Sequence, residues 1–280
     1  MNAAVLLRRG SGPELGQPLR ELLAAARAQD VALAFGEEAR VHGVEAGPGV
    51  SVGSVGLDVD VCIVLGGDGT ILGALRKFAG TDVPVFAVNF GAVGFLATVD
   101  ASHAGEGFDL ALNGAFDTMA LPSVTAGLGD ETWAGFNDIS LHRQPGSRVA
   151  KLAYAIGGDE IGRVRCDGLV VATPAGSTGY NLANGGPVLA WGVEGFVVSF
   201  ISPHSFTARA LVVAPADGLT INNTSRDEAV EVHVDGRPAC TLPAGEDLKV
   251  EFGGTHARLA QLPGATFYHR LRERFGRLAS

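Results

Sequence analysis

The sequence predicts a two-domain protein: an α/β nucleotide domain of Rossmann-like type, then a mostly antiparallel β domain, with a C-terminal helix packing back. In the first 118 residues, strand patterns alternate with helix patterns, as in a parallel sheet covered by helices. From about residue 121, short apolar runs separated by turn residues replace them. Residues 268–278 have the spacing of an amphipathic helix. We therefore expect domains at residues 1–118 and 119–262 and a helical segment at 263–280.

The spacing of apolar residues places the elements within each domain. In the first domain, strands are expected at residues 3–7, 31–35, 59–65 and 83–88, and helices at 17–29, 70–78 and 104–112. Residues 37–54 show no clear pattern. In the second domain, strands are expected at residues 124–128, 132–136, 138–142, 149–156, 169–172, 196–201, 211–213, 230–234 and 248–252, with a loop and short helix at 178–189. Residues 59–65 lack polar alternation, so this strand is expected to be buried on both faces.

Composition limits the functions that the chain can have. Its 280 residues carry a formal net charge of -9 and no long basic run, which argues against nucleic acid and anionic membranes as partners. The N-terminal apolar run is too short for a signal peptide or a membrane span. The three cysteines are far apart in the sequence, which fits a reducing compartment. We expect a cytoplasmic protein that has no membrane partner.

Residues 65–72, LGGDGTIL, carry the first candidate site, where a buried strand ends in a glycine cluster and runs into a helix. The candidates for a phosphate loop are Gly66, Gly67, Gly69 and Thr70, because glycines admit a phosphate and a helix N-terminus attracts it. Asp68 would repel a phosphate, so we interpret it as a general base or a metal contact beside that loop. The alternative is that Asp68 only caps the helix.

Two common nucleotide signatures are absent from the sequence. It has no GxxxxGK[ST] and no GxGxxG at the first strand-to-helix turn, which disfavours a P-loop enzyme and a dehydrogenase-type dinucleotide fold. A second glycine loop, at residues 89–94, begins with Asn89 and follows the strand at 83–88. Ligands of parallel sheets bind at the carboxyl ends of the strands, and both glycine loops are expected at that edge.

Three polar segments of the second domain are further candidates. Asn137 and Asp138 suit a ribose diol and an adenine edge, although such a pair is also common in turns. Residues 167–187, DGLVVATPAGSTGYNLANGGP, combine glycines with hydroxyl and amide side chains, which is typical of a loop around a polar ligand. His204 and Arg209 could face a phosphate or a carboxamide, and a structural histidine is the alternative.

Together, and in this order, these segments resemble the NAD kinase family. GGDGT at residues 66–70 is also similar to diacylglycerol and sphingosine kinases, and NFGAVGFL at residues 89–96 is similar to the family's N-x-G-x-x-G-F-L. FNDISLH, the run at residues 167–187 and SPHSFTARALVV resemble further motifs of the family, and the run at 167–187 is specific to these kinases. The resemblance extends from about residue 62 to about residue 213.

The resemblance implies an NAD kinase, which transfers the γ-phosphoryl group of ATP to the 2′-hydroxyl of the adenosine ribose of NAD, giving NADP. Asp68 would activate this hydroxyl, Mg²⁺ or another divalent cation would accompany ATP, and no protein ligand is assigned to the metal. A homodimer or homotetramer is also implied, with Arg165 reaching the phosphates in the neighbouring subunit. The residues implied for NAD are Gly69, Phe95, Asn137, Asp138, Arg165, Asp167, Thr178, Gly179 and Tyr180, and the further candidates are Asn89, Ser177, His204 and Arg209.

The sequence departs from the family pattern at a few positions. Asp138 stands where the family usually has Glu, and Ala175, Gly179 and Ala210 replace Thr or Ser, Ala and Pro. These departures bear on affinity and substrate choice and leave Asp68 in place. The alternatives are a lipid kinase of the same superfamily and a non-catalytic NAD(P)-binding module. The sequence leaves open NAD against NADH, ATP against polyphosphate, and feedback by NADP or NADPH.

Overall fold

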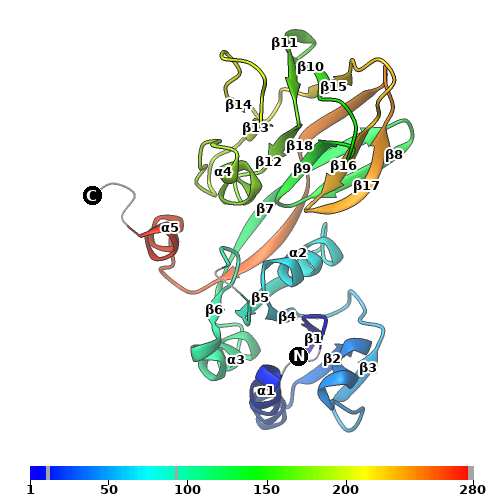
Figure 1. Ribbon diagram of the computed structural model, residues 1–280. Coiled ribbons are helices and arrows are strands. Elements are labelled where there is room, and N and C mark those ends of the chain that lie inside the picture. The colour runs from blue at the N-terminus through cyan, green and yellow to red at the C-terminus, as the bar shows by residue number, and fades with distance from the viewer. Residues whose placement is uncertain (11–12, 92–93, 277–280) are drawn as a thin grey trace. The chain divides into compact units, whose positions relative to one another are not determined.

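The computed structural model describes residues 1–10, 13–91 and 94–276, and this chain divides into two compact units (Figure 1). Unit 1 consists of Met1–Ala120 and the C-terminal segment from Ala257, and unit 2 is Leu121–His256. The sequence predicts boundaries after residues 118 and 262, so the second one lies earlier than expected. The reason is the last strand, β18 (Asp247–Gln261), whose residues Arg258 and Leu259 pair with a strand of unit 1.

Unit 1 is an α/β unit with a parallel sheet. Its strands are β1 (Asn2–Leu7), β2 (Ala32–Gly36), β3 (Val50–Gly53), β4 (Val61–Gly66), β5 (Pro84–Asn89) and β6 (Val99–Asp100). Its helices are α1 (Gly16–Ala28), α2 (Asp68–Lys77), α3 (Ala104–Leu112) and α5 (Phe267–Phe275), with 3₁₀ turns η1 (Pro13–Leu15), η2 (Glu37–His42) and η3 (Ala101–His103). The order β5-β4-β1-β2-β3 changes direction between β4 and β1. Parallel sheets bind ligands at such a switch point, beyond the carboxyl ends of the strands.

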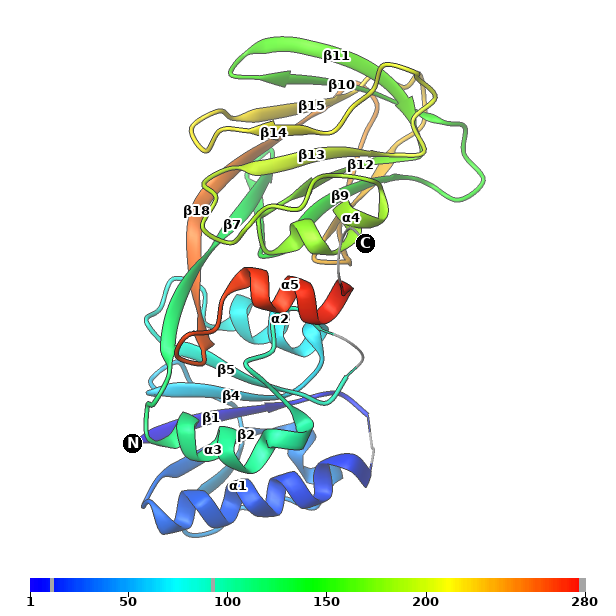
Figure 2. The same ribbon diagram turned by 90° about the vertical axis from the view of Figure 1, so that its left-hand side faces the viewer.

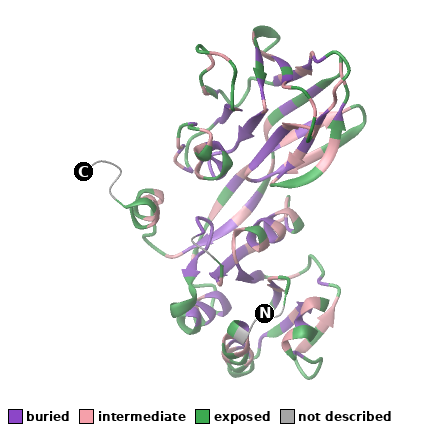
Figure 3. Ribbon diagram, viewed as in Figure 1, coloured by how far each residue is buried: buried purple, intermediate pink, exposed green. Residues whose placement is uncertain are grey.

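Helices cover both faces of this sheet, as the alternating pattern predicts. Leu19 and Leu22 of α1 and Phe108 of α3 belong to one apolar cluster with alternate residues of β1 and β4. Helix α2 packs on β4 and β5 from the opposite side (Figure 2). All residues of β4 are buried, which confirms the expected strand with two covered faces and shows as continuous purple in Figure 3.

Unit 2 is built from antiparallel sheets, as predicted. Its strands are β7 (Asp117–Leu128), which begins in unit 1, β8 (Glu131–Gly135), β9 (Asp138–Arg143), β10 (Ala150–Ile156), β11 (Asp159–Cys166), β12 (Gly168–Ala172), β13 (Phe196–Ile201), β14 (Leu211–Val213), β15 (Leu219–Asn223), β16 (Val230–Val234), β17 (Arg237–Leu242) and the start of β18. One sheet has the order β14-β13-β12-β9-β16-β17. The turn η4 (Gly176–Thr178) and the short helix α4 (Tyr180–Ala183) follow β12. The sequence patterns do not predict β11, β15 and β17.

Helix α5 lies in unit 1, although the chain reaches it from unit 2. The sequence predicts a helix over residues 268–278; the described helix ends at Phe275, and residues 277–280 lie outside the described part. Thr266 caps it, because its hydroxyl accepts a hydrogen bond from the His269 N–H at 3.2 Å. Among the described residues, no helix combines the length and the apolar character needed to cross a membrane.

Candidate functional site

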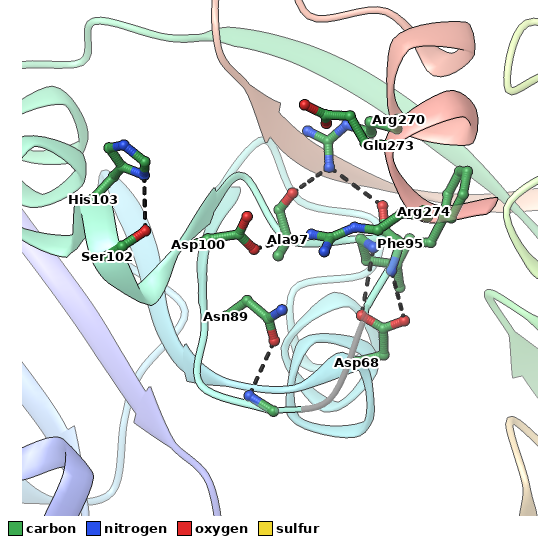
Figure 4. Close-up of polar contacts among 12 residues, drawn as sticks. Asp68, Asn89, Phe95, Ala97, Asp100, Ser102, His103, Arg270, Glu273 and Arg274 are labelled. Carbon is green, nitrogen blue, oxygen red and sulfur yellow. Dashed lines mark hydrogen bonds and ion pairs between the residues drawn. The ribbon is translucent and has the colours of Figure 1, made fainter. Parts of the chain in front are cut away.

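Asp68 is the first residue of α2, directly after the loop that ends β4. Gly67 is the N-cap residue of the helix, and the Asp68 carboxylate instead accepts hydrogen bonds from two backbone N–H groups of a distant loop. The Phe95 N–H donates to Oδ2 at 3.0 Å and the Leu96 N–H donates to Oδ1 at 3.4 Å (Figure 4). The alternative that Asp68 only caps its helix is therefore wrong. The carboxylate is held in place while its residue stays half-exposed.

The two glycine loops pack against each other through their backbones. The Phe90 N–H donates to the Gly66 carbonyl at 3.0 Å, and the Asn89 side chain accepts from the Gly91 N–H at 3.0 Å. A Cβ atom on Gly91 would lie 2.8 Å from the Gly67 Cα atom. Glycine is therefore needed at position 91 for the close approach of the loops. Residues 92–93 of the second loop lie outside the described part of the chain.

Two other glycines explain the shape of the Asp68 site. A Cβ atom on Gly94 would collide with the Asp68 carboxylate, and one on Gly66 would lie 2.8 Å from the Thr70 Cβ atom. These glycines make room for neighbouring side chains. Gly69 is different, because it is exposed and no described atom lies within 4 Å of a Cβ placed there. Packing in the described chain gives no reason for glycine at position 69.

In unit 2, the segment that carries Asn137 and Asp138 is held by the turn between β16 and β17. The Asp235 carboxylate accepts hydrogen bonds from the N–H groups of Phe136 at 3.3 Å, Asn137 at 2.7 Å and Asp138 at 3.3 Å. On the other side, the Thr173 hydroxyl donates to the Phe136 carbonyl at 2.6 Å. The Asn137 Oδ1 atom is buried and has no hydrogen-bond partner among the described residues. Such an atom is a natural acceptor for a ligand N–H or O–H group.

The Asp138 side chain is almost fully buried, 6% exposed, beside a second carboxylate. Burial, and then the charge of Asp235, raise the pKa of Asp138 to about 7. Burial also raises the pKa of Tyr180, and the charges of Asp138 and Asp167 add to this. Tyr180 therefore lies near both acids, and Asp138 changes its charge close to neutral pH.

The loop after β12 is fixed mainly by its own hydrogen bonds. The buried Ser177 hydroxyl donates to the Pro174 carbonyl at 2.7 Å and accepts from the Leu189 N–H at 2.9 Å. Ser177 thus shapes the loop. The Thr178 hydroxyl donates to the Ala175 carbonyl at 3.2 Å and is half-buried. Gly179 follows directly and precedes α4.

The remaining predicted residues of unit 2 are Asp167, Arg165, His204 and Arg209. Asp167 forms an ion pair with Arg143 at 2.5 Å, which orients its carboxylate. The side chain of Arg165 is exposed on β11, and its carbonyl accepts from the His204 N–H at 2.7 Å. Arg209 donates to two carbonyls of its own loop, at 2.8 and 2.9 Å. Tyr180 thus lies near Asp138 and Asp167, whereas Arg165 lies on β11 and His204 and Arg209 lie in the segment between β13 and β14.

Asp235 and His142 belong to the site but are not predicted from the sequence. Asp235 lies 98 positions beyond Asn137, and its only signal is the Asp-Gly turn between two strands. His142 has its ring stacked on Tyr180 with centroids 5.7 Å apart, and a β-strand histidine carries no signal of that contact. Burial, and then the charge of His233, lower the pKa of His142, which favours its neutral form. Within the described residues, no group of three or more His, Cys, Asp or Glu side chains could hold a metal ion.

A carboxylate held beside a glycine loop and a helix N-terminus, at the switch point of a parallel sheet, defines a phosphotransferase that acts on a nucleotide. Residues 49–116 match the family described as ATP-NAD kinase N-terminal domain, and residues 136–262 match ATP-NAD kinase C-terminal domain. The chain belongs to the NAD kinase family.

Relatives and solved structures agree with this assignment. An NAD kinase of Gemmatimonas aurantiaca is 37% identical over 226 residues, 78% of each chain. An NAD kinase of Desulforamulus reducens is 28% identical over 279 residues, 98% of this chain and 97% of the relative. Yeast NADH kinase complexed with NADH has a TM-score of 0.85 at 22% identity, covering 100% of this chain and 88% of that one. An Archaeoglobus fulgidus NAD kinase in complex with ATP has a TM-score of 0.76 at 24% identity, covering 99% and 98%. These two structures support the fold.

Proposed function

We propose that Asp68 is the general base with which this chain phosphorylates the 2′-hydroxyl of the adenosine ribose of NAD. The overall activity is that of an NAD kinase, a phosphotransferase that uses ATP and forms NADP. The observation that carries the proposal is the pair of hydrogen bonds from Phe95 and Leu96, which aim a half-exposed carboxylate from the start of α2. A binding module needs no such carboxylate beside a phosphate loop, so this observation favours the enzyme.

A base is required because a ribose hydroxyl is a weak nucleophile. A carboxylate within hydrogen-bond reach accepts the hydroxyl proton as the new P–O bond forms and the bond to the leaving ADP breaks. Both backbone donors bind the carboxylate from the side of residues 95–96, which fixes its orientation before the substrate arrives. Mg²⁺ or another divalent cation, bound with ATP, neutralises part of the triphosphate charge.

The loop formed by Gly66, Gly67, Gly69 and Thr70 is proposed to hold the phosphates of ATP. The unpaired N–H groups and positive end of α2 attract an anion there. The Thr70 N–H is already used, because it donates to the Gly67 carbonyl at 2.9 Å. The exposed backbone at Gly69 is therefore the point at which a phosphate can come closest to the helix.

This role gives a prediction for Gly69→Ala. The new methyl group meets no described atom of the protein, so stability should be unchanged or slightly higher, as for glycine to alanine within a helix. It occupies the space proposed for a phosphate, and kcat/KM for ATP should fall about tenfold or more. Steady-state kinetics and thermal unfolding measure the two effects. Gly73→Ala, later in α2 and equally unobstructed, is the control and should match wild type; equal kinetics for both variants would contradict the phosphate loop.

Unit 2 is proposed to bind the adenosine part of NAD. The free Asn137 Oδ1 acceptor and the Asp138 carboxyl suit the adenine and the ribose diol, and Thr178 with the Gly179 backbone lines the same pocket. Phe95 packs near the adenine, while Asp167 and Tyr180 face the nicotinamide end. Arg165 reaches the phosphates of NAD bound to a neighbouring subunit. Asn89 has a loop-shaping role in this scheme, and His204 and Arg209 line the outer edge.

The raised pKa of Asp138 predicts a pH-dependent affinity for NAD. An ionised carboxylate can accept from both ribose hydroxyls, and with a pKa of about 7 it is mostly protonated at pH 6 and mostly ionised at pH 8. KM for NAD should therefore fall about tenfold between these two pH values. Burial and the charge of His233 lower the pKa of His142, which favours the neutral form of this neighbouring side chain. Asp138→Asn cannot titrate, so its KM should be higher and flat with pH; a wild-type KM that does not change would refute this role.

Further properties follow from the family and are proposed for this chain. We propose a homodimer or homotetramer in the cytoplasm, with ATP as donor and polyphosphate as a donor to be tested. Incubation with NAD or NADH, a divalent cation and either donor, followed by assay of NADP or NADPH, decides donor and acceptor. Diacylglycerol in place of NAD tests the lipid kinase alternative. Light scattering coupled to size-exclusion chromatography measures the molar mass and so gives the number of subunits.

A further inference from the structure

Helix α5 carries a half-buried arginine, Arg270, that points toward the loop contacting Asp68. The Arg270 guanidinium donates through Nη1 to the carbonyls of Phe95, at 3.3 Å, and Ala97 (Figure 4). Through Nη2 it donates to the Gln261 Oε1 atom at 2.6 Å. Phe95 and Ala97 lie 175 and 173 residues before Arg270 in the sequence, and Gln261 is the last residue of β18. A planar guanidinium holds several acceptors at once in a fixed geometry, which an ammonium group cannot do.

The same helix holds the aromatic ring of Phe95. The ring centroids of Phe267 and Phe275, near the two ends of α5, lie 5.6 and 6.0 Å from that of Phe95. The helix is also tied to the end of β6 by an ion pair of 3.0 Å between Arg274 and Asp100. Helix α5 therefore contacts residues 95–97 through a half-buried cation and two rings, and the end of β6 through an ion pair. This is more than an amphipathic helix needs in order to cover a sheet edge.

The contacts of Arg270 and of Asp68 share one peptide group. The Phe95 carbonyl, which accepts from Arg270, and the Leu96 N–H, which donates to Asp68, belong to the same planar unit. Hydrogen bonds in series polarise one another and fix the plane between them. Burial lowers the pKa of Arg270 to about 10, so the guanidinium remains charged at neutral pH. Asp68 itself is among the charges that favour the protonated form of Arg270.

We propose that Arg270 is a positioning residue for phosphoryl transfer: it holds the peptide between Phe95 and Leu96 so that its N–H fixes the Asp68 carboxylate. Arg270 then acts from α5 through this peptide, and it touches neither substrate. The inference rests on the proposed role of Asp68. Loss of Arg270 releases the loop, and the base loses its orientation while the groups proposed for adenosine binding in unit 2 are unchanged.

The test compares Arg270→Gln with Arg272→Gln in the full-length protein. Arg272 lies on the same helix and is exposed, and its Nη2 atom lies 3.3 Å from His269 Nδ1 within that helix. The two variants therefore lose the same charge, but only Arg270→Gln removes the contacts with residues 95–97. We expect kcat of Arg270→Gln to fall about 10- to 100-fold, as for a misplaced catalytic group. KM for NAD should change less than kcat, because Phe95 is the one residue proposed for adenosine binding that Arg270 contacts. Arg272→Gln should keep the wild-type kcat. Arg270→Lys, which keeps the charge but not the fork, should recover only part of kcat.

Two results would overturn the proposal. One is a kcat for Arg270→Gln equal to that of Arg272→Gln; the other is a loss confined to KM for NAD, since the helix would then act on binding. If Arg270→Gln does not fold, Gln261→Met removes one anchor of the guanidinium and must still lower kcat. If Asp68→Asn keeps its activity, Asp68 is not the base and the proposed function fails. If Asp68→Asn is inactive but Arg270→Gln keeps its kcat, only the positioning role of Arg270 fails.

Discussion

Replacing Asp68 by Asn should lower kcat for NADP formation by about 10²- to 10⁴-fold, which is the usual contribution of a positioned base. Asparagine has the same shape, and its Oδ1 atom can still accept from the Phe95 N–H, the shorter of the two hydrogen bonds, while the longer one from Leu96 is lost. It cannot take the proton of the ribose hydroxyl. Binding of NAD, measured by calorimetry, should stay within a few-fold of wild type while turnover is lost.

A matched control shows that the loss does not come from charge alone. Asp58→Asn changes the same charge at an exposed position of unit 1 and should leave kcat unchanged. The control needs the same change of charge, because the loss of any negative charge alters the electrostatic potential at a phosphate site. If Asp68→Asn forms NADP at the wild-type rate, another group accepts the proton and the assignment of the base is incorrect.

The sequence could predict the frame that presents Asp68. A strand without alternation, then glycines, then a helical pattern places the loop at the carboxyl end of a buried strand, and β4 and α2 confirm it. This works because both signals are local. The partners of the carboxylate are not predictable in this way, since the N–H groups of Phe95 and Leu96 are backbone atoms that every sequence has.

Asp235 and Arg270 could not be predicted from the sequence because their contacts are long-range. Asp235 and Arg270 act on residues 97 to 99 and 173 to 175 positions away, and spacing along the chain contains no trace of either contact. The strands β11 and β17 were missed for a different reason. Strand β11 is mostly exposed and charged, and β17 contains Pro238, so neither shows an apolar run. Two glycines, Gly253 and Gly254, similarly interrupt the pattern of β18 before it enters unit 1.

Gly176→Ala should strongly disrupt the proposed adenosine site of unit 2, because Gly176 lies in the loop after β12 and packs against Asn137. The added Cβ would lie 2.6 Å from the Asn137 Cα atom and collide with the Asn137 carbonyl, which already accepts from the Thr173 N–H at 2.9 Å. Backbone cannot rotate away as a side chain can, so the turn and the Asn137 segment must separate. We expect the free energy of unfolding to fall by about 1 to 3 kcal/mol. The affinity for NAD should fall by about tenfold, the value of a lost hydrogen bond.

Denaturant unfolding and NAD binding measured on the same preparation separate the two effects. Gly192→Ala is the control, because Gly192 is exposed beyond the same loop and no described atom lies within 4 Å of its added Cβ. It should match wild type in both measurements. A Gly176→Ala protein that is less stable but binds NAD normally would show that the position of Asn137 does not matter for binding. The base at Asp68 would then be the better supported half of the proposed site, because its geometry does not depend on this contact.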